Sequence, residues 1–200
     1  MDFAVLTESA MRDWLLEVAR LKIQVFREWP YLYDLDMDYD SRYLSHYAMA
    51  PDSVLVLVMD GDEVVGASTG MPLIHEKSHF KKQFQENGMM VQDWYYFAES
   101  VLLPRYRGKG LGNHLFDLRK EFAEKRDFQK FCFLDNEKDE PRKPLDARDL
   151  KGFWRQKGFC PTDLFLQISC KENGESASVQ KSLRLYVNEA SLGSATFPLK

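Results

Sequence analysis

The sequence contains few cysteines and no excess of basic residues, and each of these absences excludes a class of protein. Only 3 of 200 residues are cysteine. Cys132, Cys160 and Cys170 form no Cys-x-x-Cys pair, so we expect reduced thiols rather than a disulfide framework or a cysteine-rich zinc site. The 27 Lys and Arg against 31 Asp and Glu give a formal net charge of −4. This charge argues against nucleic acid as a partner.

Long apolar runs are also absent. No stretch approaches the roughly 20 residues needed to span a bilayer, and the N-terminus lacks the basic and apolar segments of a secretory signal. We therefore expect a cytoplasmic protein with no membrane partner. Hydrophobic residues form 44% of the chain and aromatic residues 14%, which is enough for a core and argues against disorder. With 200 residues and no internal repeat, we expect a single domain over residues 1–200.

Hydrophobic patterns predict an α/β fold with a mixed sheet. The turn at residues 60–62 separates two apolar runs, so these runs should form a hairpin. Strands are expected at residues 2–6, 53–59, 64–69, 94–103, 129–134, 163–170 and 179–187. Helices are expected from residue 8 to Pro30, at 41–50, within 72–88, at 108–126 and at 149–156, with a loop at 135–148.

The first predicted helix has an apolar face. Leu16, Ala19, Ile23 and Phe26 recur at i, i+3, i+7 and i+10, the spacing of one side of a helix. Thr7 is a suitable cap for its first turn, and the four apolar residues are expected to face the core.

The most informative segment, residues 101–113, runs from a strand through a glycine-dense turn into an amphipathic helix. Glycines such as Gly108 and Gly110 let successive backbone N–H groups converge, and a helix N-terminus adds the positive end of its dipole. Arg107 and Lys109 bring two cations to the same place. The segment therefore predicts an anion site suited to a pyrophosphate.

Two familiar nucleotide-binding motifs do not fit this turn. A Walker loop needs Ser or Thr after its lysine, but Lys109 is followed by Gly110. The dinucleotide fingerprint G-x-G-x-x-G would need a third glycine where Asn113 stands. A nucleotide-binding protein that uses the same turn in another way stays open as an alternative.

The residues Arg107-Gly108-Lys109-Gly110-Leu111-Gly112 match the signature [Q/R]-x-x-G-x-[G/A], and in them the chain resembles the GNAT superfamily of acyl-CoA N-acyltransferases. Residues 153–159, FWRQKGF, are similar to the family's F-Y-x-x-x-G-F. The element order also fits, so the resemblance covers roughly residues 3–187. It implies a mostly antiparallel mixed sheet of about seven strands flanked by helices. In that sheet the parallel strands at 94–103 and 129–134 splay apart to admit the acyl-CoA.

The resemblance also implies an activity. Acetyl-CoA or another acyl-CoA would be the cosubstrate, with no metal, and the acceptor would be the primary amine of a small molecule. The protein would act as a monomer or homodimer. The turn would bind the pyrophosphate, and the strand before it the pantetheine arm and thioester. The implied cosubstrate contacts are Val101, Leu102, Leu103, Arg107, Gly108, Lys109, Gly110, Leu111, Gly112, Asn113 and Asn136.

One position departs from the family. Its frequent general acid is a tyrosine where this chain has Trp154, and an indole cannot protonate a thiolate at neutral pH. Either another group or water supplies the proton, or the protein binds acyl-CoA without efficient transfer. A non-catalytic acyl-CoA-binding module is therefore the alternative function.

Acyl transfer to an amine needs a base for the amine and an acid for the thiolate. Glu99 is the best base, because it lies in an otherwise apolar strand close to the expected thioester. A salt-bridged structural glutamate is the other interpretation. Tyr95, Tyr96 and Cys132 are possible acids. Strict strand alternation places Tyr95 on the face of Glu99, which favours Tyr95 over Tyr96.

Residues 31–40 alternate tyrosines with Asp34, Asp36, Asp38 and Asp40, and are expected to form a loop before the second helix. In GNAT-like folds this segment borders the acceptor. Carboxylates and aromatic faces attract an ammonium, so the hypothesis is a small cationic amine as acceptor. A solvated acidic loop is the alternative.

Overall fold

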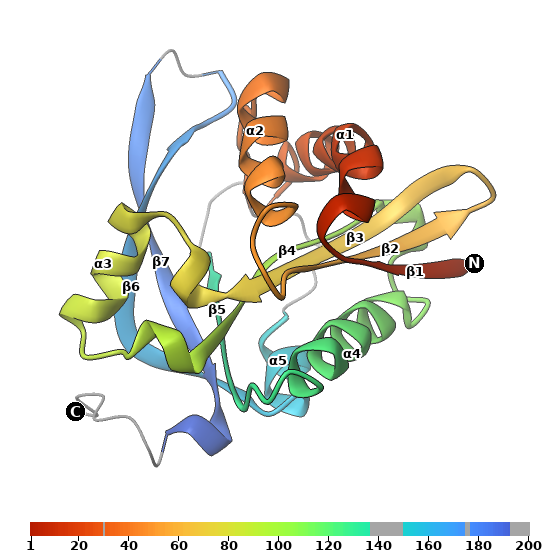
Figure 1. Cartoon of the computed structure of the whole chain (residues 1–200). Helices are drawn as coiled ribbons and strands as arrows, with labels where there is room; N and C mark the ends of the chain where they lie inside the picture. The colour runs from red at the N-terminus through yellow and green to blue at the C-terminus, as the bar shows by residue number, and fades with distance from the viewer. Residues whose placement is uncertain (30, 137–149, 175–176, 193–200) are drawn as a thin grey trace.

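The computed structural model describes residues 1–29, 31–136, 150–174 and 177–192. One seven-stranded sheet forms the centre of the molecule, in the order β1-β2-β3-β4-β5-β7-β6 (Figure 1). The strands are β1 (Asp2–Leu6), β2 (Val54–Asp60), β3 (Glu63–Pro72), β4 (Trp94–Leu102), β5 (Lys130–Asp135), β6 (Phe159–Lys171) and β7 (Ser178–Asn188). The helices are α1 (Leu15–Phe26), α2 (Met37–Tyr47), α3 (Ser78–Glu86), α4 (Leu111–Glu124) and α5 (Lys151–Gln156).

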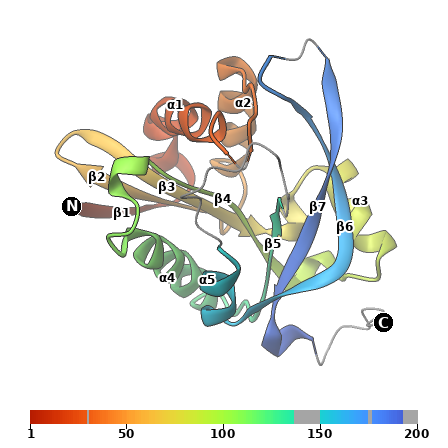
Figure 2. The same cartoon turned by 180° about the vertical axis from the view of Figure 1, so that it is seen from behind.

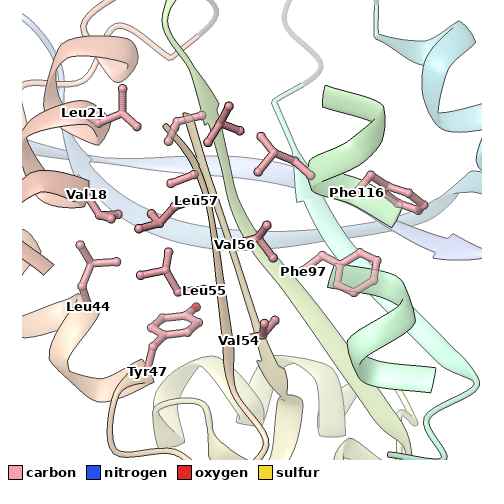
Figure 3. Close-up of a cluster of buried hydrophobic side chains, with 14 of the residues drawn as sticks. Val18, Leu21, Leu44, Tyr47, Val54, Leu55, Val56, Leu57, Phe97 and Phe116 are labelled. Carbon is pink, nitrogen blue, oxygen red and sulfur yellow. The ribbon is translucent and has the colours of Figure 1, made fainter. Parts of the chain in front are cut away.

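The helices cover both faces of the sheet. Helices α1 and α2 lie on one face and α4 on the other, with α5 beside α4 (Figures 1 and 2). Strand β2 is buried on both faces, as its continuous apolar run predicted. Leu55 and Leu57 point toward α1 and α2, and Val54 and Val56 toward α4 (Figure 3).

The sheet is mixed, because β4 and β5 run parallel whereas the other neighbouring strands are antiparallel. The parallel pairing ends at Tyr96 opposite Cys132. Beyond that point β4 continues to Leu102 and β5 to Asp135 without pairing with each other. The predicted splay of these two strands is thus confirmed.

The long β6–β7 hairpin reaches back to the segment between α1 and α2. The Asp34 N–H donates to the Lys171 carbonyl at 2.8 Å, and the Asn173 N–H donates to the Leu32 carbonyl at 2.9 Å. These backbone bonds join the hairpin tip to the segment that the resemblance places at the acceptor side.

The elements differ from prediction mainly at their ends. The acidic stretch is not a loop throughout, because α2 already begins at Met37, capped by the Asp36 carboxylate. A 3-10 helix at Glu8–Trp14 precedes α1, and the Thr7 side chain makes no capping bond. Strand β6 begins at Phe159, four residues before the predicted 163.

Pro30, residues 137–149 of the predicted loop and helix start, and part of the last turn lie outside the described residues. Within the described ranges, no helix has the length and apolar character required to cross a membrane.

Candidate functional site

A glycine turn joins β4 to α4 and leaves a row of backbone N–H groups unbonded. Gly108 and Gly110 adopt φ angles of 78° and 83°, a left-handed conformation that glycine reaches without strain. In the described chain, the N–H groups of residues 108–112 have no acceptor. A Cβ built on Gly110 or Gly112 would meet no atom within 4 Å. Because the 14-residue helix α4 begins here, the turn fits an anion such as a pyrophosphate.

The row of free N–H groups is shorter at both ends than residues 107–113, the implied cosubstrate contacts of this turn. The Arg107 N–H donates to the Pro104 carbonyl at 3.1 Å, and the Asn113 N–H donates to the Gly110 carbonyl at 3.0 Å. Residues 108–112 therefore form the part of the turn that can bind an anion through its backbone.

The backbone of β4 next to the turn is partly occupied. The Leu103 N–H donates to the Val65 carbonyl at 3.0 Å, which ties it to β3 rather than to the gap beside β5. The Leu102 carbonyl accepts a bond from Arg107 Nε at 3.0 Å. Arg107 also pairs with Glu28, two residues after the end of α1, with Nη2 and Oε2 3.1 Å apart. Of these two predicted pantetheine contacts, the Leu102 carbonyl becomes available if the Arg107 side chain moves away, whereas the Leu103 N–H is used within the sheet.

A β-bulge in β4 decides which way Glu99 points. The register between β3 and β4 shifts between Ser68 and Gly70, so that Ala98 and Glu99 both lie opposite Thr69. The extra residue reverses the alternation of side chains along the strand. Glu99 therefore faces α1 and α2.

The expected pairing of Tyr95 with Glu99 on one face is therefore wrong. Phe97 and Tyr95 face α4, and the Phe97 ring lies 5.7 Å from the ring of Phe116 (Figure 3). The Tyr95 hydroxyl donates to the Asp52 carbonyl at 2.9 Å. Burial raises the pKa of Tyr95 well above its ordinary value. In this position Tyr95 is a core residue whose hydroxyl is already bonded.

Glu99 lies in a buried cluster of polar side chains, which we call the Glu99 cluster: Lys22, Asp40, Thr69 and Glu99. Lys22 Nζ is 2.9 Å from Glu99 Oε1 and 2.9 Å from Asp40 Oδ1. The Thr69 hydroxyl donates to Glu99 Oε2 at 2.8 Å and accepts the Glu99 N–H at 3.1 Å. Lys22 is 6% exposed, Asp40 0% and Glu99 8%, so the charges interact with little screening by water.

Burial and pairing act in opposite directions on this cluster. Burial by itself lowers the pKa of Lys22, but the charges of Glu99 and Asp40 outweigh it, so the pKa of Lys22 is raised. Burial raises the pKa of Asp40, and the Lys22 ammonium opposes that rise only in part. Lys22 is therefore a firmly protonated cation between two carboxylates.

Arg119 of α4 supports the bulge from the other face. Its Nη1 donates to the Thr69 carbonyl at 3.0 Å and to the Glu99 carbonyl at 2.9 Å. The guanidinium lies 4.2 Å from the centre of the Phe97 ring. Burial lowers the pKa of Arg119 to about 10. Arg119 thus donates to two carbonyls that would accept N–H groups of neighbouring strands in a regular sheet.

A chain of hydroxyl groups lies next to the Glu99 cluster. Tyr43 and Tyr47 of α2 share a hydrogen bond of 2.9 Å between their hydroxyls, and Tyr47 donates to Glu76 Oε1 at 3.1 Å. Burial raises the pKa of both tyrosines and of Glu76. The tyrosines are therefore neutral donors at physiological pH.

Tyr96 lies on the opposite face of β4 from Tyr95, at the point where β4 and β5 stop pairing. It is the last residue of β4 that pairs with β5, and its ring lies 5.3 Å from that of Phe80 in α3. Burial raises its pKa, and the nearby charges of Glu76 and Glu99 raise it further. Cys132, opposite Tyr96, is fully buried, and burial raises the pKa of its thiol, so it is neutral too.

Two predicted residues lie where β5 leaves β4. The Trp154 indole is 4.4 Å from the ring of Phe133, the first residue of β5 beyond the paired part. Among the residues that the structure describes, its buried Nε1 has no hydrogen-bond partner, whereas buried donors are normally paired. Asn136 directly follows β5 and is 5% exposed.

The acidic residues before and within α2 do not act as one free surface. Asp36 caps α2 by accepting a backbone N–H at 2.9 Å, and Asp40 belongs to the Glu99 cluster. Asp34 lies 3.5 Å from both an arginine and a lysine. Asp38 is exposed. The described residues contain no group of three or more His, Cys, Asp or Glu placed to hold a metal ion.

Sequence reasoning missed Lys22, Thr69 and Arg119. A signal for Lys22 was available, because Val18, Leu21, Lys22 and Val25 share the buried face of α1. A charged residue on such a face implies a buried partner. No comparable sequence signal marks Thr69, since its role depends on the bulge opposite.

Comparison with known proteins agrees with this geometry. The family model described as the acetyltransferase (GNAT) family matches residues 21–144. The chain is similar in structure to a GNAT-family acetyltransferase from Staphylococcus aureus Mu50, with 15% identity, TM-score 0.57, and 94% of this chain and 98% of that chain covered. It is also similar to the ribosomal-protein-alanine N-acetyltransferase from Brucella melitensis, with 13% identity, TM-score 0.58, and coverage of 94% and 99%.

A third similar structure is that of the PaiA N-acetyltransferase from Thermoplasma acidophilum in complex with coenzyme A. Here the identity is 10%, the TM-score 0.55, and the coverage 92% of this chain and 98% of that chain. Among curated proteins no sequence matches. At these identities, the structural likenesses show the fold.

Proposed function

Because the chain belongs to the GNAT family of acetyltransferases, we propose that it transfers an acyl group, in the first place acetyl, from CoA to the primary amine of a small molecule. The observation that carries this proposal is the position of the glycine turn at the end of β4, directly beside the gap that opens where β4 leaves β5. An anion site next to the point where two parallel strands stop pairing suits a long ligand with a pyrophosphate at one end. A free nucleotide would need no such separation of strands.

The residues present fit acyl-CoA. The free N–H groups of residues 108–112 suit the pyrophosphate, with Arg107 and Lys109 contributing positive charge. Leu102 and Val101 border the gap for the pantetheine arm, and Asn136 lies at its far side after β5. When bound, the cosubstrate supplies an acyl group activated as a thioester.

For the chemistry we assign Glu99 as the base that takes a proton from the acceptor amine, because it is the carboxylate at the bulge beside the gap. Each oxygen of Glu99 accepts one bond, from Lys22 or from Thr69, and a carboxylate oxygen has a second lone pair. Tyr96 replaces Tyr95 as the proposed acid for the leaving thiolate, since it lies where β4 and β5 stop pairing, whereas the Tyr95 hydroxyl is bonded to the Asp52 carbonyl. A backbone N–H near Val101 or Leu102 is the proposed donor to the thioester oxygen.

Two observations favour a small acceptor inside the cytoplasm. The β6–β7 hairpin tip is hydrogen-bonded to residues 32–34, so the two segments at the expected acceptor side are held together. This supports an acceptor whose amine end is narrow. Cys132, Cys160 and Cys170 are all free thiols, which supports a reducing compartment.

The second candidate is an acyl-CoA-binding module without turnover. It is favoured by Trp154 in place of the family's tyrosine and by the ion pair that already occupies Glu99. The two functions share the cosubstrate site and differ in whether free thiol is released.

Two measurements on the whole protein test these functions. Thermal shifts with CoA, acetyl-CoA, ATP and NAD should show protection by the two CoA compounds only. Thiol release from acetyl-CoA with a panel of small primary amines should then exceed the rate without amine. Protection by ATP or NAD but not CoA would contradict the site assignment. Protection by CoA with no amine-dependent thiol release would instead favour the binding module.

A further inference from the structure

The two charged neighbours of Glu99 in the Glu99 cluster come from other elements, Lys22 from α1 and Asp40 from α2. We infer that Lys22 and Asp40 are positioning residues that orient the Glu99 carboxylate and together set the pH range in which acyl transfer runs. This inference rests on the proposed function, in which Glu99 takes the proton of the acceptor amine.

The cluster is unbalanced in charge. One ammonium lies between two carboxylates, each 2.9 Å away, and all three residues are at most 8% exposed. A buried ion pair is a poor means of stabilising a fold, because apolar residues of similar size often do as well or better. An extra, uncompensated carboxylate is worse still. The arrangement is therefore better explained by its effect on the Glu99 carboxylate than by a contribution to the stability of the fold.

The contacts fix the orientation of the Glu99 carboxylate. Lys22 holds Oε1 at 2.9 Å and the Thr69 hydroxyl holds Oε2 at 2.8 Å, so the carboxylate plane cannot rotate freely. Lys22 is itself held, because its ammonium also lies over the Tyr43 ring, 4.5 Å from the centroid. Asp40 is the second anchor of that ammonium. Its Oδ1 lies 2.9 Å from the ammonium, the same distance as Glu99 Oε1, so the two carboxylates share Lys22 equally.

Groups from every neighbouring element face Glu99. On its own side of the sheet these are Lys22, Tyr31, Asp40, Tyr43, Tyr47, Glu76 and Tyr96, and from the α4 side Arg119 bonds its carbonyl. The tyrosines are neutral because burial raises the pKa of each. Glu76 and Asp40 place negative charge near Glu99, and Lys22 and Arg119 place positive charge near it. Among the described residues Lys22 is the cation in ion-pair contact with the Glu99 carboxylate.

Two substitutions should therefore move the pH profile in opposite directions. Lys22→Met removes the positive charge and leaves two carboxylates side by side, so the acidic limb of kcat/KM should move to higher pH by about one unit or more. Asp40→Asn removes the competing negative charge, so that within the described chain Glu99 is the one carboxylate left in ion-pair contact with Lys22. The acidic limb should then move to lower pH, and kcat on the plateau should fall because a more readily ionised carboxylate is a weaker base.

Lys181→Met is the matched control for loss of a buried lysine. Lys181 is 5% exposed, pairs with Glu172 at 2.6 Å and lies 4.5 Å from the centroid of the Tyr33 ring. Its surroundings thus resemble those of Lys22, but its carboxylate partner is not Glu99. This variant should lose stability and keep the acidic limb of the parent.

The experiment measures kcat/KM for the best amine from pH 5 to 9 in the parent and the three variants. In parallel, carbon-13 NMR follows the side-chain carboxyl of Glu99 during a titration without substrate. Opposite shifts of the acidic limb in Lys22→Met and Asp40→Asn, with none in Lys181→Met, support the inference. An unmoved limb in both cluster variants overturns it, even if both are less stable.

Two difficulties are covered by this design. If Lys22→Met does not fold, Asp40→Asn decides, since it removes charge from the cluster with almost no change of shape: a shift to lower pH supports the inference and no shift overturns it. If the parent shows no turnover with any amine, the proposed function fails. The NMR titration then tests the inferred effect of Asp40 on Glu99 separately. A titration midpoint of the Glu99 carboxyl that is the same in Asp40→Asn as in the parent overturns the inference, and a midpoint at lower pH supports it.

Discussion

The Thr69 hydroxyl contacts Glu99 twice, accepting its backbone N–H at 3.1 Å and donating to its carboxylate Oε2 at 2.8 Å. The two contacts are coupled by the bulge. Because Ala98 and Glu99 together lie opposite Thr69, the ladder cannot serve every backbone group there, and a side chain satisfies the Glu99 N–H instead. One hydroxyl thus fixes both the strand irregularity and the direction of the carboxylate.

Thr69→Val should therefore impair both folding and turnover. Valine has the same shape but leaves the Glu99 N–H buried without an acceptor, which costs about 1–3 kcal/mol. Urea denaturation should show that loss, and kcat should fall because Glu99 loses one of its two side-chain anchors. Thr69→Ser keeps the hydroxyl and should stay close to the parent in kcat. Equal effects of the two substitutions would show that the hydroxyl does not position Glu99.

Local sequence patterns were sufficient for most of the fold. The apolar run of β2, the glycine turn and the apolar face of α4 each act within a few neighbouring residues, and each is where it was predicted. The parallel pairing and the splay of β4 and β5 came from the resemblance to a family, since parallel pairing between distant segments leaves no local pattern.

The bulge is what strand alternation could not reveal. Counting from Tyr95 in steps of two places Glu99 on the face of α4, but one extra residue in β4 reverses it. A bulge depends on how two strands pair, so a pattern within one strand does not contain it. The expectation that Tyr95 shares the face of Glu99 failed for this single reason.

The face of α1 was misread for a different reason. Leu16, counted as part of the core, is 51% exposed, whereas Lys22 is 6% exposed. The actual buried face includes Val18 and Val25 together with Lys22. A pattern that admits only apolar residues cannot include a buried lysine, whose presence depends on carboxylates from α2 and β4.

Gly112→Asp should separate cosubstrate binding from stability. Gly112 is the second residue of α4, and a Cβ there meets no atom within 4 Å, so the side chain is accommodated. A carboxylate near a helix N-terminus contributes about 0.3–1 kcal/mol of stability, yet it repels a pyrophosphate. Calorimetry with CoA should show affinity lower by about tenfold or more, a loss of about 1.4 kcal/mol, while the melting temperature is kept or raised.

Gly112→Ala is the control, because it adds a methyl group without charge and the family signature admits alanine at this position. It should bind CoA nearly as well as the parent. Unchanged CoA affinity in Gly112→Asp would remove the pyrophosphate from this turn.

Trp154→Tyr should raise kcat if proton delivery to the thiolate limits the rate. The indole Nε1 can donate a hydrogen bond but cannot give up its proton at neutral pH, whereas a phenol can. Trp154→Phe removes the donor without adding an acid, and its kcat should not exceed that of the parent. Steady-state rates of thiol release compare the three proteins. A Trp154→Tyr rate no higher than that of Trp154→Phe would mean that a phenol at this position delivers no proton, and the acid would remain Tyr96, as proposed.

Glu76→Gln should gain stability relative to the parent as pH rises. Burial raises the pKa of Glu76 in the folded protein above its ordinary value. A carboxyl with a raised folded-state pKa contributes most below its unfolded pKa, about 4.3, and that contribution is lost as pH rises through the folded pKa. The difference in free energy of unfolding between parent and variant should therefore shift toward the variant from pH 4 to 7, by at most about 1.4 kcal/mol per pH unit. Denaturation curves at both pH values measure it, and Glu86→Gln, at an exposed glutamate of α3, should show a smaller change.

Glu99→Gln is the direct test of the proposed base. Glutamine still accepts the Thr69 hydroxyl, and loss of one carboxylate leaves Lys22 balanced by Asp40, so the variant should fold. The proposed role predicts that kcat falls about 10²-fold or more at neutral pH, in line with typical general-base contributions. The loss should shrink at high pH, where free amine becomes abundant and needs no base, and CoA affinity should not change because the glycine turn is untouched. A rate near that of the parent at every pH would leave Glu99 as the anchor of Lys22 and the bulge, and the proton of the amine would have to leave through water.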